Sequence, residues 1–372
     1  MKKNIKIALV HDFLTEYGGA ERVLETLVEM YPSAKVYTSY FDKSKFGKGG
    51  IYLTETEIVE SFFQKIPMFP KILSPMRIFA PMVFMKFDLS GYDLVISSTN
   101  TYFAKAVNFT GVHICYCHTP PRYLYGYPTA RNWKKSFAGR IVGEFMNFWL
   151  RQVDFKVSQK PTVMIANSKE VQKRIQKFYR RDSIVVYPPI DIKKAILPQK
   201  GEYYLIVSRL ARAKRVDLVV LAAKKLNINL VIVGSGIEME SLKQIAGNKT
   251  KFLGFVPDDE LWSVYAKAKA FIFSAEEEDF GMTAVEAMAA GKPVIALRQG
   301  GVKESVIDGE TGIFFDEASV ESLISAIKKF EKMKFDTHKI LERSKEFSKE
   351  EFEKITTNTT IAAIQNLFLT IK

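Results

Sequence analysis

The sequence predicts an α/β protein of two doubly wound domains in tandem, each a mostly parallel sheet covered by helices. Short apolar runs typical of buried strands alternate with helix-forming segments until Tyr187-Pro188-Pro189-Ile190-Asp191, and a fresh alternation begins at Tyr203. A chain of 372 residues suits two domains, at about 150 residues each. We expect a first domain over 1–192, a linker over 193–201, a second domain over 202–346, and a helical segment over 347–372 that returns to the first domain. Two such domains imply a cleft between them.

The first domain opens with a strand, a glycine loop and a helix. The apolar run Ile5 to Val10 is followed by Gly18-Gly19, and the apolar positions of the next helix fall on one face. A glycine pair at this turn allows a ligand to approach the backbone, although tight turning alone also explains it. The spacing does not match the dinucleotide fingerprint, which argues against a nicotinamide cofactor. Further strands are expected at Asp93 to Ser97, His113 to Cys117, Thr162 to Asn167 and Ile184 to Tyr187.

His118 directly follows one of these expected strands, and Pro120 and Pro121 force a turn after it. The carboxyl end of a parallel strand is where open α/β sheets bind ligands. A lone histidine is more often structural, but this one stands where function is expected.

The second domain repeats the pattern, with strands expected at Tyr203 to Val207, Asn229 to Val233, Lys251 to Gly254, Ala270 to Phe273 and Pro293 to Ala296. Arg209 and Lys214 follow the first of these strands. Cations at this point can neutralise a diphosphate, for which Arg offers a fork and Lys a point charge. Surface solvation is the alternative for either residue alone.

The stretch from Ser274 to Ala296 combines carboxylates, a glycine turn, a helix and a strand. Residues 282–290 are rich in helix formers, and Gly291 ends the helix. Its first N–H groups suit hydroxyls, phosphate or carboxylate, and Glu278 and Glu286 can accept hydrogen bonds from sugar hydroxyls. The alternative is an acidic loop that caps the start of the helix.

The net charge of +13 is concentrated in the first half, where residues 1–191 hold 27 Lys and Arg against 16 Asp and Glu. Such a balance fits nucleic acid or an anionic membrane surface. Cys115 and Cys117 are too close along one strand for a disulfide and too few for a metal site. We expect a cytoplasmic protein without a signal peptide or a membrane-spanning stretch, either free or attached to a membrane face.

Residues Ser61 to Phe87 favour the membrane alternative. This segment has four basic residues, no acidic residue, four prolines and many Phe, Met and Ile side chains. The mixture suits the interfacial layer of a bilayer, although helices broken by proline and packed on the core would explain it equally well. A second basic and aromatic stretch, Arg131 to Lys156, includes Trp133, Phe137, Phe145, Phe148 and Trp149. Nucleic acid would need a basic groove with aromatic side chains that stack on bases.

Several motifs, taken in order, resemble those of one enzyme family. They are Gly18-Gly19-Ala20-Glu21-Arg22, Cys117-His118-Thr119-Pro120, Ala166-Asn167-Ser168, Pro188-Pro189-Ile190-Asp191, Ser208-Arg209-Leu210 with Lys214, Val233-Gly234-Ser235-Gly236, Gly254-Phe255-Val256-Pro257, and the pair Glu278 and Glu286. Over nearly its whole length the chain resembles the retaining glycosyltransferases of family 4, which have the GT-B architecture and use nucleotide-sugar donors. It looks most like the mannosyltransferase branch that builds bacterial surface polysaccharides.

The resemblance implies roles for individual residues. Arg209 and Lys214 would bind the donor diphosphate, although Arg212 and Arg215 compete with Lys214 for that assignment. Glu286 would bind the ribose, and Glu278 with the backbone of Phe280, Gly281, Met282 and Thr283 would hold the transferred sugar and phosphate. Gly234 would belong to the donor site, Phe255 and Val256 would hold the base, Gly18 and Gly19 would lie near the donor phosphate and acceptor, and His118 would line the reaction centre.

The chemistry implied is a metal-independent transfer of a hexose with retention at the anomeric carbon. The resemblance favours mannose from GDP-mannose, or a UDP-sugar, with a lipid-linked glycan as acceptor, no other cofactor and no nucleic acid. Arg209, Lys214 and the helix start near Gly281 would stabilise the leaving diphosphate. Alternatives are a nucleotide-sugar epimerase or sugar-phosphate synthase on the same fold, or a non-catalytic glycan- or nucleic-acid-binding protein.

Overall fold

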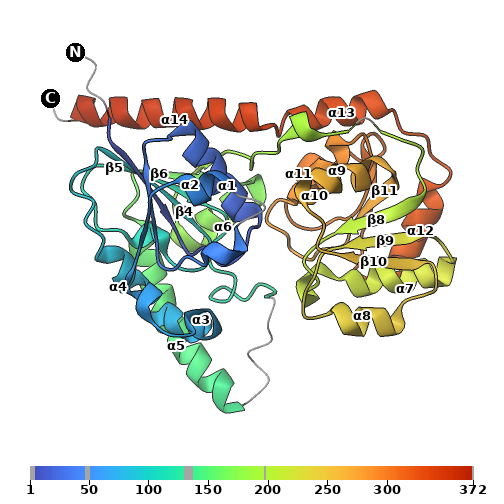
Figure 1. Ribbon diagram of the computed structural model, residues 1–372, viewed down its shortest axis with the longest axis horizontal. Coiled ribbons are helices and arrows are strands. Elements are labelled where there is room, and N and C mark those ends of the chain that lie inside the picture. The colour runs from blue at the N-terminus through green and yellow to red at the C-terminus, as the bar shows by residue number, and fades with distance from the viewer. Residues whose placement is uncertain (1–4, 47–50, 130–136, 197, 371–372) are drawn as a thin grey trace. The chain divides into compact units, whose positions relative to one another are not determined.

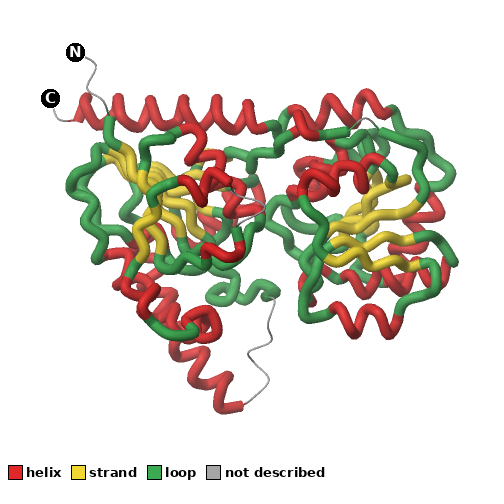
Figure 2. The backbone as a smooth tube through the Cα atoms, viewed as in Figure 1, coloured by secondary structure: helices red, strands yellow, loops and turns green. Residues whose placement is uncertain are grey.

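A computed structural model describes residues 5–46, 51–129, 137–196 and 198–370. The chain divides into two compact units (Figure 1). Unit 1 runs to Tyr127, resumes through Pro189 and includes the segment from Phe352 onward, and unit 2 contains Ile190–Glu351. Each unit is built on one sheet, and Figure 2 shows the strands of the two sheets in yellow. The prediction of two doubly wound domains is confirmed.

The sheet of unit 1 has seven strands in the order β3-β2-β1-β4-β5-β6-β7, and every neighbouring pair is parallel. The central strands β1, β4 and β5 are almost fully buried, as expected for strands covered on both faces. The strand bounds are β1 Ile7–His11, β2 Lys35–Thr38, β3 Ile58–Glu60, β4 Leu94–Thr99, β5 Val112–Cys117, β6 Val163–Ala166 and β7 Ile184–Val185.

The helices of unit 1 cover both faces of this sheet. They are α1 Gly19–Met30, α2 Ile51–Glu55, α3 Phe69–Met76, α4 Ala80–Met85, α5 Phe137–Ser158, α6 Lys169–Tyr179 and the long helix α14 Lys349–Thr370. Short 3-10 turns lie at Lys43–Lys45, Phe62–Lys65, Arg77–Phe79 and Ala104–Ala106.

Alternate residues of the strands feed two separate cores in unit 1. Leu9 of β1 packs with α1 and with Phe352 and Ala363 of α14. Ala8 and Val10 pack on the other face with α4 and α5. The last helix of the chain is therefore part of the core of the first unit, on the same face as α1.

The sheet of unit 2 has six parallel strands in the order β10-β9-β8-β11-β12-β13. Their bounds are β8 Tyr203–Val207, β9 Leu230–Val233, β10 Thr250–Gly254, β11 Ala268–Phe273, β12 Val294–Leu297 and β13 Gly312–Phe315. The helices are α7 Val216–Leu226, α8 Met239–Ile245, α9 Asp258–Ala266, α10 Met282–Ala289, α11 Val302–Ser305, α12 Val320–Phe330 and α13 Thr337–Lys345, with 3-10 turns at Ile192–Lys194 and Arg212–Lys214.

Ile190, which was expected in the first domain, and Gln199 of the expected linker 193–201 both bond to unit 2. The N–H of Ile190 donates to the carbonyl of Phe347 at 3.1 Å, and the N–H of Lys349 donates to the carbonyl of Ile190 at 3.0 Å. Further along, the N–H of Gln199 donates to the carbonyl of Ala266 at 2.8 Å. The unit boundary therefore falls at Pro189, and the polar residues after it are hydrogen-bonded and not free.

Candidate active site

The residues expected to bind the donor stand after strands that are neighbours in the sheet of unit 2. Arg209 is exposed two residues beyond the end of β8, Gly234 follows β9, and the loop with Glu278 follows β11. Because parallel strands end at one edge of the sheet, this order brings the three loops to the same edge.

Lys214 meets Glu278 directly. Its Nζ donates to Oε2 of Glu278 at 2.6 Å, and both side chains are about four-fifths buried, with exposed fractions of 23% and 21%. The backbones of the two loops are also joined, since the hydroxyl of Ser274 donates to the carbonyl of Lys214 at 2.8 Å and the N–H of Glu276 donates to the carbonyl of Ala213 at 3.0 Å. A cation and a carboxylate are thus held together where a diphosphate sugar is expected.

Arg215 has a different role. It adopts a left-handed backbone conformation with φ 48° and bonds to Glu276 at 2.6 Å and to Asp217 at 3.2 Å. This ion-pair cluster fixes the start of α7. Arg212 is exposed to solvent. Among the cations that compete for the diphosphate role, Lys214 is the one in contact with Glu278.

A second glycine pair, Gly300-Gly301, packs against the backbone of Glu278. The N–H of Gly301 donates to the carbonyl of Glu278 at 2.8 Å. A Cβ atom on Gly300, which has φ +67°, would lie 2.2 Å from the same carbonyl oxygen. A side chain at either glycine would therefore displace the carboxylate loop. This pair was not among the candidates named from the sequence, although a glycine pair three residues after the end of the buried strand β12 is a visible signal.

The start of α10 is formed by backbone and not by side chains. Gly281 caps the helix in a left-handed conformation with φ 97°, and a Cβ atom there would lie 2.9 Å from the ring of Phe273. The ring of Phe280 is buried against Phe347, with a centroid distance of 5.4 Å. Only the backbone of Phe280 is therefore available to a ligand, while Met282 and Thr283 are partly exposed.

Glu286 lies inside the unit. Its exposed fraction is 3%, and its Oε2 accepts a hydrogen bond from the hydroxyl of Tyr265 at 2.7 Å. The other residues of α10 from Ala284 to Ala289 are buried with it. The expectation that Glu286 binds ribose hydroxyls is not tested by this contact, which shows how Tyr265 fixes the carboxylate.

The ends of β9 and β10 carry a glycine turn and two exposed apolar side chains. Gly234 has φ +121°, and a Cβ atom there would lie 1.9 Å from the carbonyl oxygen of Ser208. Its N–H donates to the carbonyl of Gly254 at 2.7 Å. Phe255 is 73% exposed and Ile237 is 69% exposed, while Val256 is half-buried. A free aromatic face at this edge suits a flat ring.

In unit 1, Gly18 and Gly19 stand at the start of α1. The N–H of Gly18 donates to Oε2 of Glu21 at 3.0 Å, and a Cβ atom on Gly18 would lie 3.2 Å from that oxygen. Gly19 is the exposed first residue of the helix. The glycine at position 18 therefore leaves room for the carboxylate of Glu21, a contact that the sequence analysis did not include.

His118 is fixed at the end of β5. Its backbone N–H donates to the backbone carbonyl of Thr99 at 2.9 Å, and the ring atom Nε2 lies 2.8 Å from the hydroxyl of Ser98. Burial, and after it the nearby ring of His11, lower the pKa of His118 to about 3. The imidazole is therefore neutral at physiological pH.

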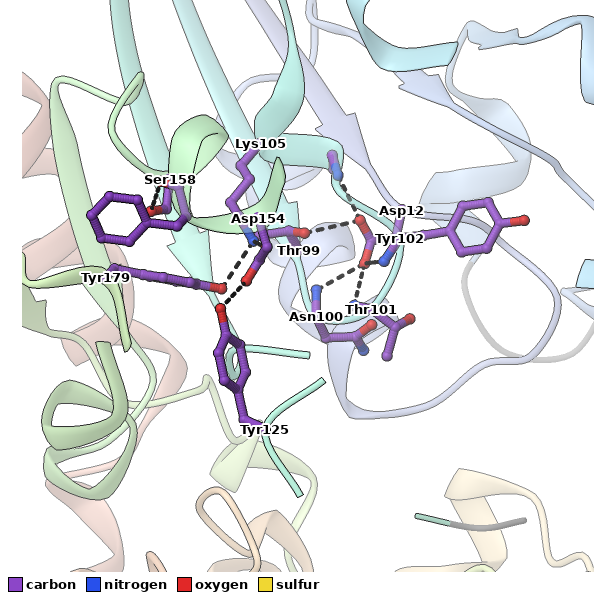
Figure 3. Close-up of polar contacts among 12 residues, drawn as sticks. Asp12, Thr99, Asn100, Thr101, Tyr102, Lys105, Tyr125, Asp154, Ser158 and Tyr179 are labelled. Carbon is purple, nitrogen blue, oxygen red and sulfur yellow. Dashed lines mark hydrogen bonds and ion pairs between the residues drawn. The ribbon is translucent and has the colours of Figure 1, made fainter. Parts of the chain in front are cut away.

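Asp12 organises the loop after β4, as Figure 3 shows. Its two carboxylate oxygens accept five hydrogen bonds of 2.7 to 2.9 Å, and the side chain is 2% exposed. The donors are the hydroxyl of Thr99 and the backbone N–H groups of Asn100, Thr101, Tyr102 and Ala104. Asp12 was not among the candidate residues named from the sequence.

A buried ion pair lies between the same loop and α5 (Figure 3). Nζ of Lys105 is 2.7 Å from Oδ1 of Asp154, and the two side chains are 1% and 0% exposed. Lys105 also donates to the hydroxyl of Tyr179 at 3.0 Å, and the hydroxyl of Tyr125 donates to Oδ2 of Asp154 at 2.8 Å. Burial lowers the pKa of Lys105 and the charge of Asp154 raises it, with a net rise. The two side chains are therefore paired in the interior of unit 1.

The segment Ser61–Phe87 has some apolar side chains buried in the core of unit 1 and others exposed. Phe63, Phe69 and Phe84 are fully buried in the core. Other large apolar side chains of this segment and of α5 are exposed, and we refer to them together as the apolar surface of unit 1; they are Phe62, Met68, Ile72, Phe79, Met82, Met85, Phe145, Phe148, Trp149 and Phe155. Lys65, Lys86 and Lys156 are exposed beside these residues in sequence. Trp133 and the start of the second basic stretch lie outside the described residues.

Among the residues that the structure describes, no helix is long and apolar enough to cross a membrane. No group of three or more His, Cys, Asp or Glu side chains in the same residues is placed to hold a metal ion.

Comparisons with known proteins cover nearly the whole chain. The model described as Glycosyltransferase Family 4 matches residues 17–194, and the model described as Glycosyl transferases group 1 matches residues 189–350. An uncharacterized glycosyltransferase of Methanocaldococcus jannaschii is 30% identical over 192 residues, which are 50% of this chain and 54% of the relative. A GDP-mannose-dependent alpha-mannosyltransferase of Mycolicibacterium smegmatis is 34% identical over 120 residues, 32% of each protein. The matched part of the chain thus spans about half or less of the length of these relatives.

A crystal structure of Anabaena HepE in complex with UDP has a TM-score of 0.68 to this chain, with 19% identity, and the match covers 96% of this chain and 100% of that one. At this level of identity the likeness concerns the fold.

Proposed function

Because this chain belongs to the family 4, or group 1, glycosyltransferases of GT-B fold, we propose that it transfers a hexose from a nucleotide-sugar donor to a lipid-linked oligosaccharide or polysaccharide acceptor. The observation that carries the proposal is the contact of Lys214 with Glu278 at the carboxyl edge of the unit 2 sheet. A cation for the diphosphate and a carboxylate for sugar hydroxyls are the two groups that a nucleotide-sugar donor requires.

For the donor we favour GDP-mannose. The support is a GDP-mannose-dependent mannosyltransferase among the relatives and the resemblance of the Gly18 and His118 motifs to the mannosyltransferase branch. UDP bound to HepE makes a UDP-sugar the competing donor. In either case the exposed face of Phe255 is available to stack on the base.

We propose that the reaction retains the anomeric configuration. The bond between the anomeric carbon and the diphosphate oxygen breaks, and the acceptor hydroxyl attacks the same face. Its proton passes to the departing phosphate, so the products are the extended glycan and a nucleoside diphosphate. Arg209, Lys214 and the N-terminus of α10 stabilise the negative charge on the leaving group, which removes the need for a metal.

Glu278 and His118 are assigned to the sugar. The carboxylate of Glu278 is held by Lys214, and the backbone carbonyl of Glu278 accepts from the N–H of Gly301, so the side chain is preorganised to accept hydroxyl hydrogen bonds. His118 is neutral and offers an imidazole that bonds without repelling a developing positive charge at the anomeric carbon.

The test is product formation from labelled GDP-mannose and UDP-sugars with a polyprenyl-diphosphate-linked acceptor, in EDTA. We expect labelled lipid with the anomeric configuration of the donor, and loss of product in Lys214→Ala. Arg212→Ala is the matched control, because Arg212 is an exposed cation two residues earlier. An isomerised donor would instead indicate an epimerase, a sugar phosphate would indicate a synthase, and no turnover at all would favour a binding protein.

We propose further that the protein attaches to the inner face of the cytoplasmic membrane through the apolar surface of unit 1. Cations beside exposed aromatic and methionine side chains fit anionic headgroups over acyl chains. The wild type should float together with anionic vesicles, whereas the double variant Met68→Ser with Met82→Ser should not. Ile361→Ser, which changes an exposed apolar residue of α14, is the control. Equal flotation of all three would contradict the attachment.

A further inference from the structure

Four polar side chains form a row along one face of the unit 1 sheet. Oε1 of Glu21 lies 3.6 Å from Nε2 of His11, Nδ1 of His11 lies 3.1 Å from the hydroxyl of Ser98, and the same hydroxyl lies 2.8 Å from Nε2 of His118. The four residues are 7%, 2%, 0% and 7% exposed in that order. Water is therefore largely excluded from the contacts between them.

The register of the sheet produces this row. His11 of β1 is paired with Ser98 of β4, and Ser98 is paired with Tyr116 of β5. His118 comes two residues after Tyr116 and so returns to the same face. Glu21 joins the row from the first turn of α1, where the N–H of Gly18 holds its other oxygen at 3.0 Å.

A row of this kind has a direction, because a neutral imidazole carries one N–H and a hydroxyl has one hydrogen. With His11 neutral, the carboxylate of Glu21 favours an N–H on Nε2 of His11 over a lone pair there, whereas a protonated His11 would donate to Ser98 and reverse the row. Nδ1 of the neutral His11 then accepts a hydrogen bond from the hydroxyl of Ser98. The oxygen of Ser98 can now only accept, and it accepts from Nε2–H of His118.

We propose that Glu21 and Ser98 are positioning residues that hold His118 in its Nε2–H tautomer, so that Nδ1 is left as a hydrogen-bond acceptor for a substrate hydroxyl. The assignment of the hydroxyl to a sugar rests on the proposed function, whereas the tautomer rests on the contacts alone. Burial lowers the pKa of His118 to about 3, which keeps the imidazole neutral and able to accept.

The proposal explains the glycine at position 18. A Cβ atom there would lie 3.2 Å from Oε2 of Glu21 and would press on the carboxylate that sets the direction of the row. Gly18 therefore contributes to the site through Glu21, in addition to any role near a ligand.

The other face of the same strands provides a matched control. The hydroxyl of Ser97 lies 2.8 Å from Nε2 of His113. This contact has the same distance and the same atoms as the contact between Ser98 and His118, but it lies on the opposite face of the sheet. Burial likewise lowers the pKa of His113 to about 3. Ser97 is not part of the row, so Ser97→Ala should leave His118 unchanged.

The experiment is nitrogen NMR of the full chain with labelled histidine, which distinguishes protonated from unprotonated ring nitrogens. His118→Gln identifies the signals of His118. We expect a single Nε2–H tautomer at His118 in the wild type and in Ser97→Ala, and a mixture of tautomers in Ser98→Ala and in Glu21→Gln. An Nδ1–H tautomer in the wild type, or an unchanged spectrum in both Ser98→Ala and Glu21→Gln, would overturn the proposal.

Kinetics separate this proposal from the proposed function. With the donor identified, Ser98→Ala should lower kcat about ten-fold with little change in the KM of the donor, the size expected for one misplaced hydrogen bond. Ser97→Ala should keep kcat within about two-fold. If the protein turns over no nucleotide sugar, the proposed function fails while the NMR result still decides the tautomer. A kcat unchanged in Ser98→Ala would overturn the positioning role.

Discussion

Replacing Glu278 by Gln separates the two roles assigned to the pair with Lys214. In the wild type the ammonium of Lys214 is already neutralised by a carboxylate at 2.6 Å, so an incoming diphosphate competes with Glu278 for it. The substitution removes the negative charge and keeps the shape of the side chain. A nucleoside diphosphate should therefore bind more tightly to Glu278→Gln, whereas sugar transfer should slow because the sugar loses a charged acceptor.

The size of the effect follows from the burial of the pair. Exposed ion pairs contribute about 0.2–1 kcal/mol, and breaking a buried pair costs about 3–5 kcal/mol. With roughly a fifth of each side chain exposed, the pair lies nearer the exposed class after solvent screening. Release of about 1 kcal/mol corresponds to nucleoside diphosphate affinity higher by about five-fold.

Isothermal titration of GDP, or of UDP if that is the nucleotide bound, measures the change. Glu276→Gln is the matched control, since Glu276 lies two residues away and pairs with Arg215 instead of Lys214. Its affinity for the nucleoside diphosphate should equal that of the wild type. Weaker binding in Glu278→Gln than in the wild type would refute the competition between Glu278 and the diphosphate.

Three further predictions concern stability. Asp12→Asn should lower the free energy of unfolding by about 3 kcal/mol in urea denaturation, because one amide oxygen cannot replace a carboxylate that accepts five hydrogen bonds. Lys105→Met should cost about 3–5 kcal/mol by leaving Asp154 charged and unpaired, and the double variant Lys105→Met with Asp154→Leu should recover most of it. Because burial lowers the pKa of His113 and His118 from 6.5 to about 3, the unfolded state binds more protons between these values, so the stability present above pH 6.5 should fall as pH decreases toward 3.

Each of these predictions has its own control. Asp88→Asn changes an exposed carboxylate that accepts hydrogen bonds from the backbone N–H and the hydroxyl of Ser90, and it should leave the urea midpoint unchanged. A double variant no more stable than Lys105→Met would contradict the unpaired-charge explanation. For the histidines, His113→Gln should flatten the loss of stability below pH 6.5, whereas exposed His338→Gln should not.

The fold was largely predictable from the sequence because its central strands are continuous apolar runs bounded by glycine and proline. Tyr203 to Val207 was predicted with the bounds that β8 has in the structure. The strands β2, β3 and β13 were missed, since each has only three or four residues and offers too short an apolar run to stand out. The start of the last helix shifted from 347 to Lys349, where Ser348 caps it.

Lys214 and Glu278 were each assigned to the donor site from the sequence, and the structure brings the two side chains into contact, while their roles toward a donor stay a prediction. The candidate site was not predictable where function depends on register. Nothing in the local sequence shows that Asp12 meets residues 99–104, or that Glu21, His11, Ser98 and His118 form one row, because strand pairing joins positions about 90 residues apart. For Glu286 the sequence showed its spacing from Glu278, but it did not show that the side chain is buried and accepts a hydrogen bond from Tyr265.

The most direct test of the central claim is the thermal unfolding midpoint of the protein with GDP-, UDP-, ADP- and dTDP-sugars in the absence of metal. A ligand at 100 times its Kd stabilises the folded state by about 2.7 kcal/mol, which raises the midpoint measurably. The account predicts a rise with one nucleotide, retained in Arg212→Ala and lost in Arg209→Ala and Lys214→Ala. No rise with any of the four, or a rise that persists in both Arg209→Ala and Lys214→Ala, would contradict a nucleotide-sugar site at this edge of unit 2.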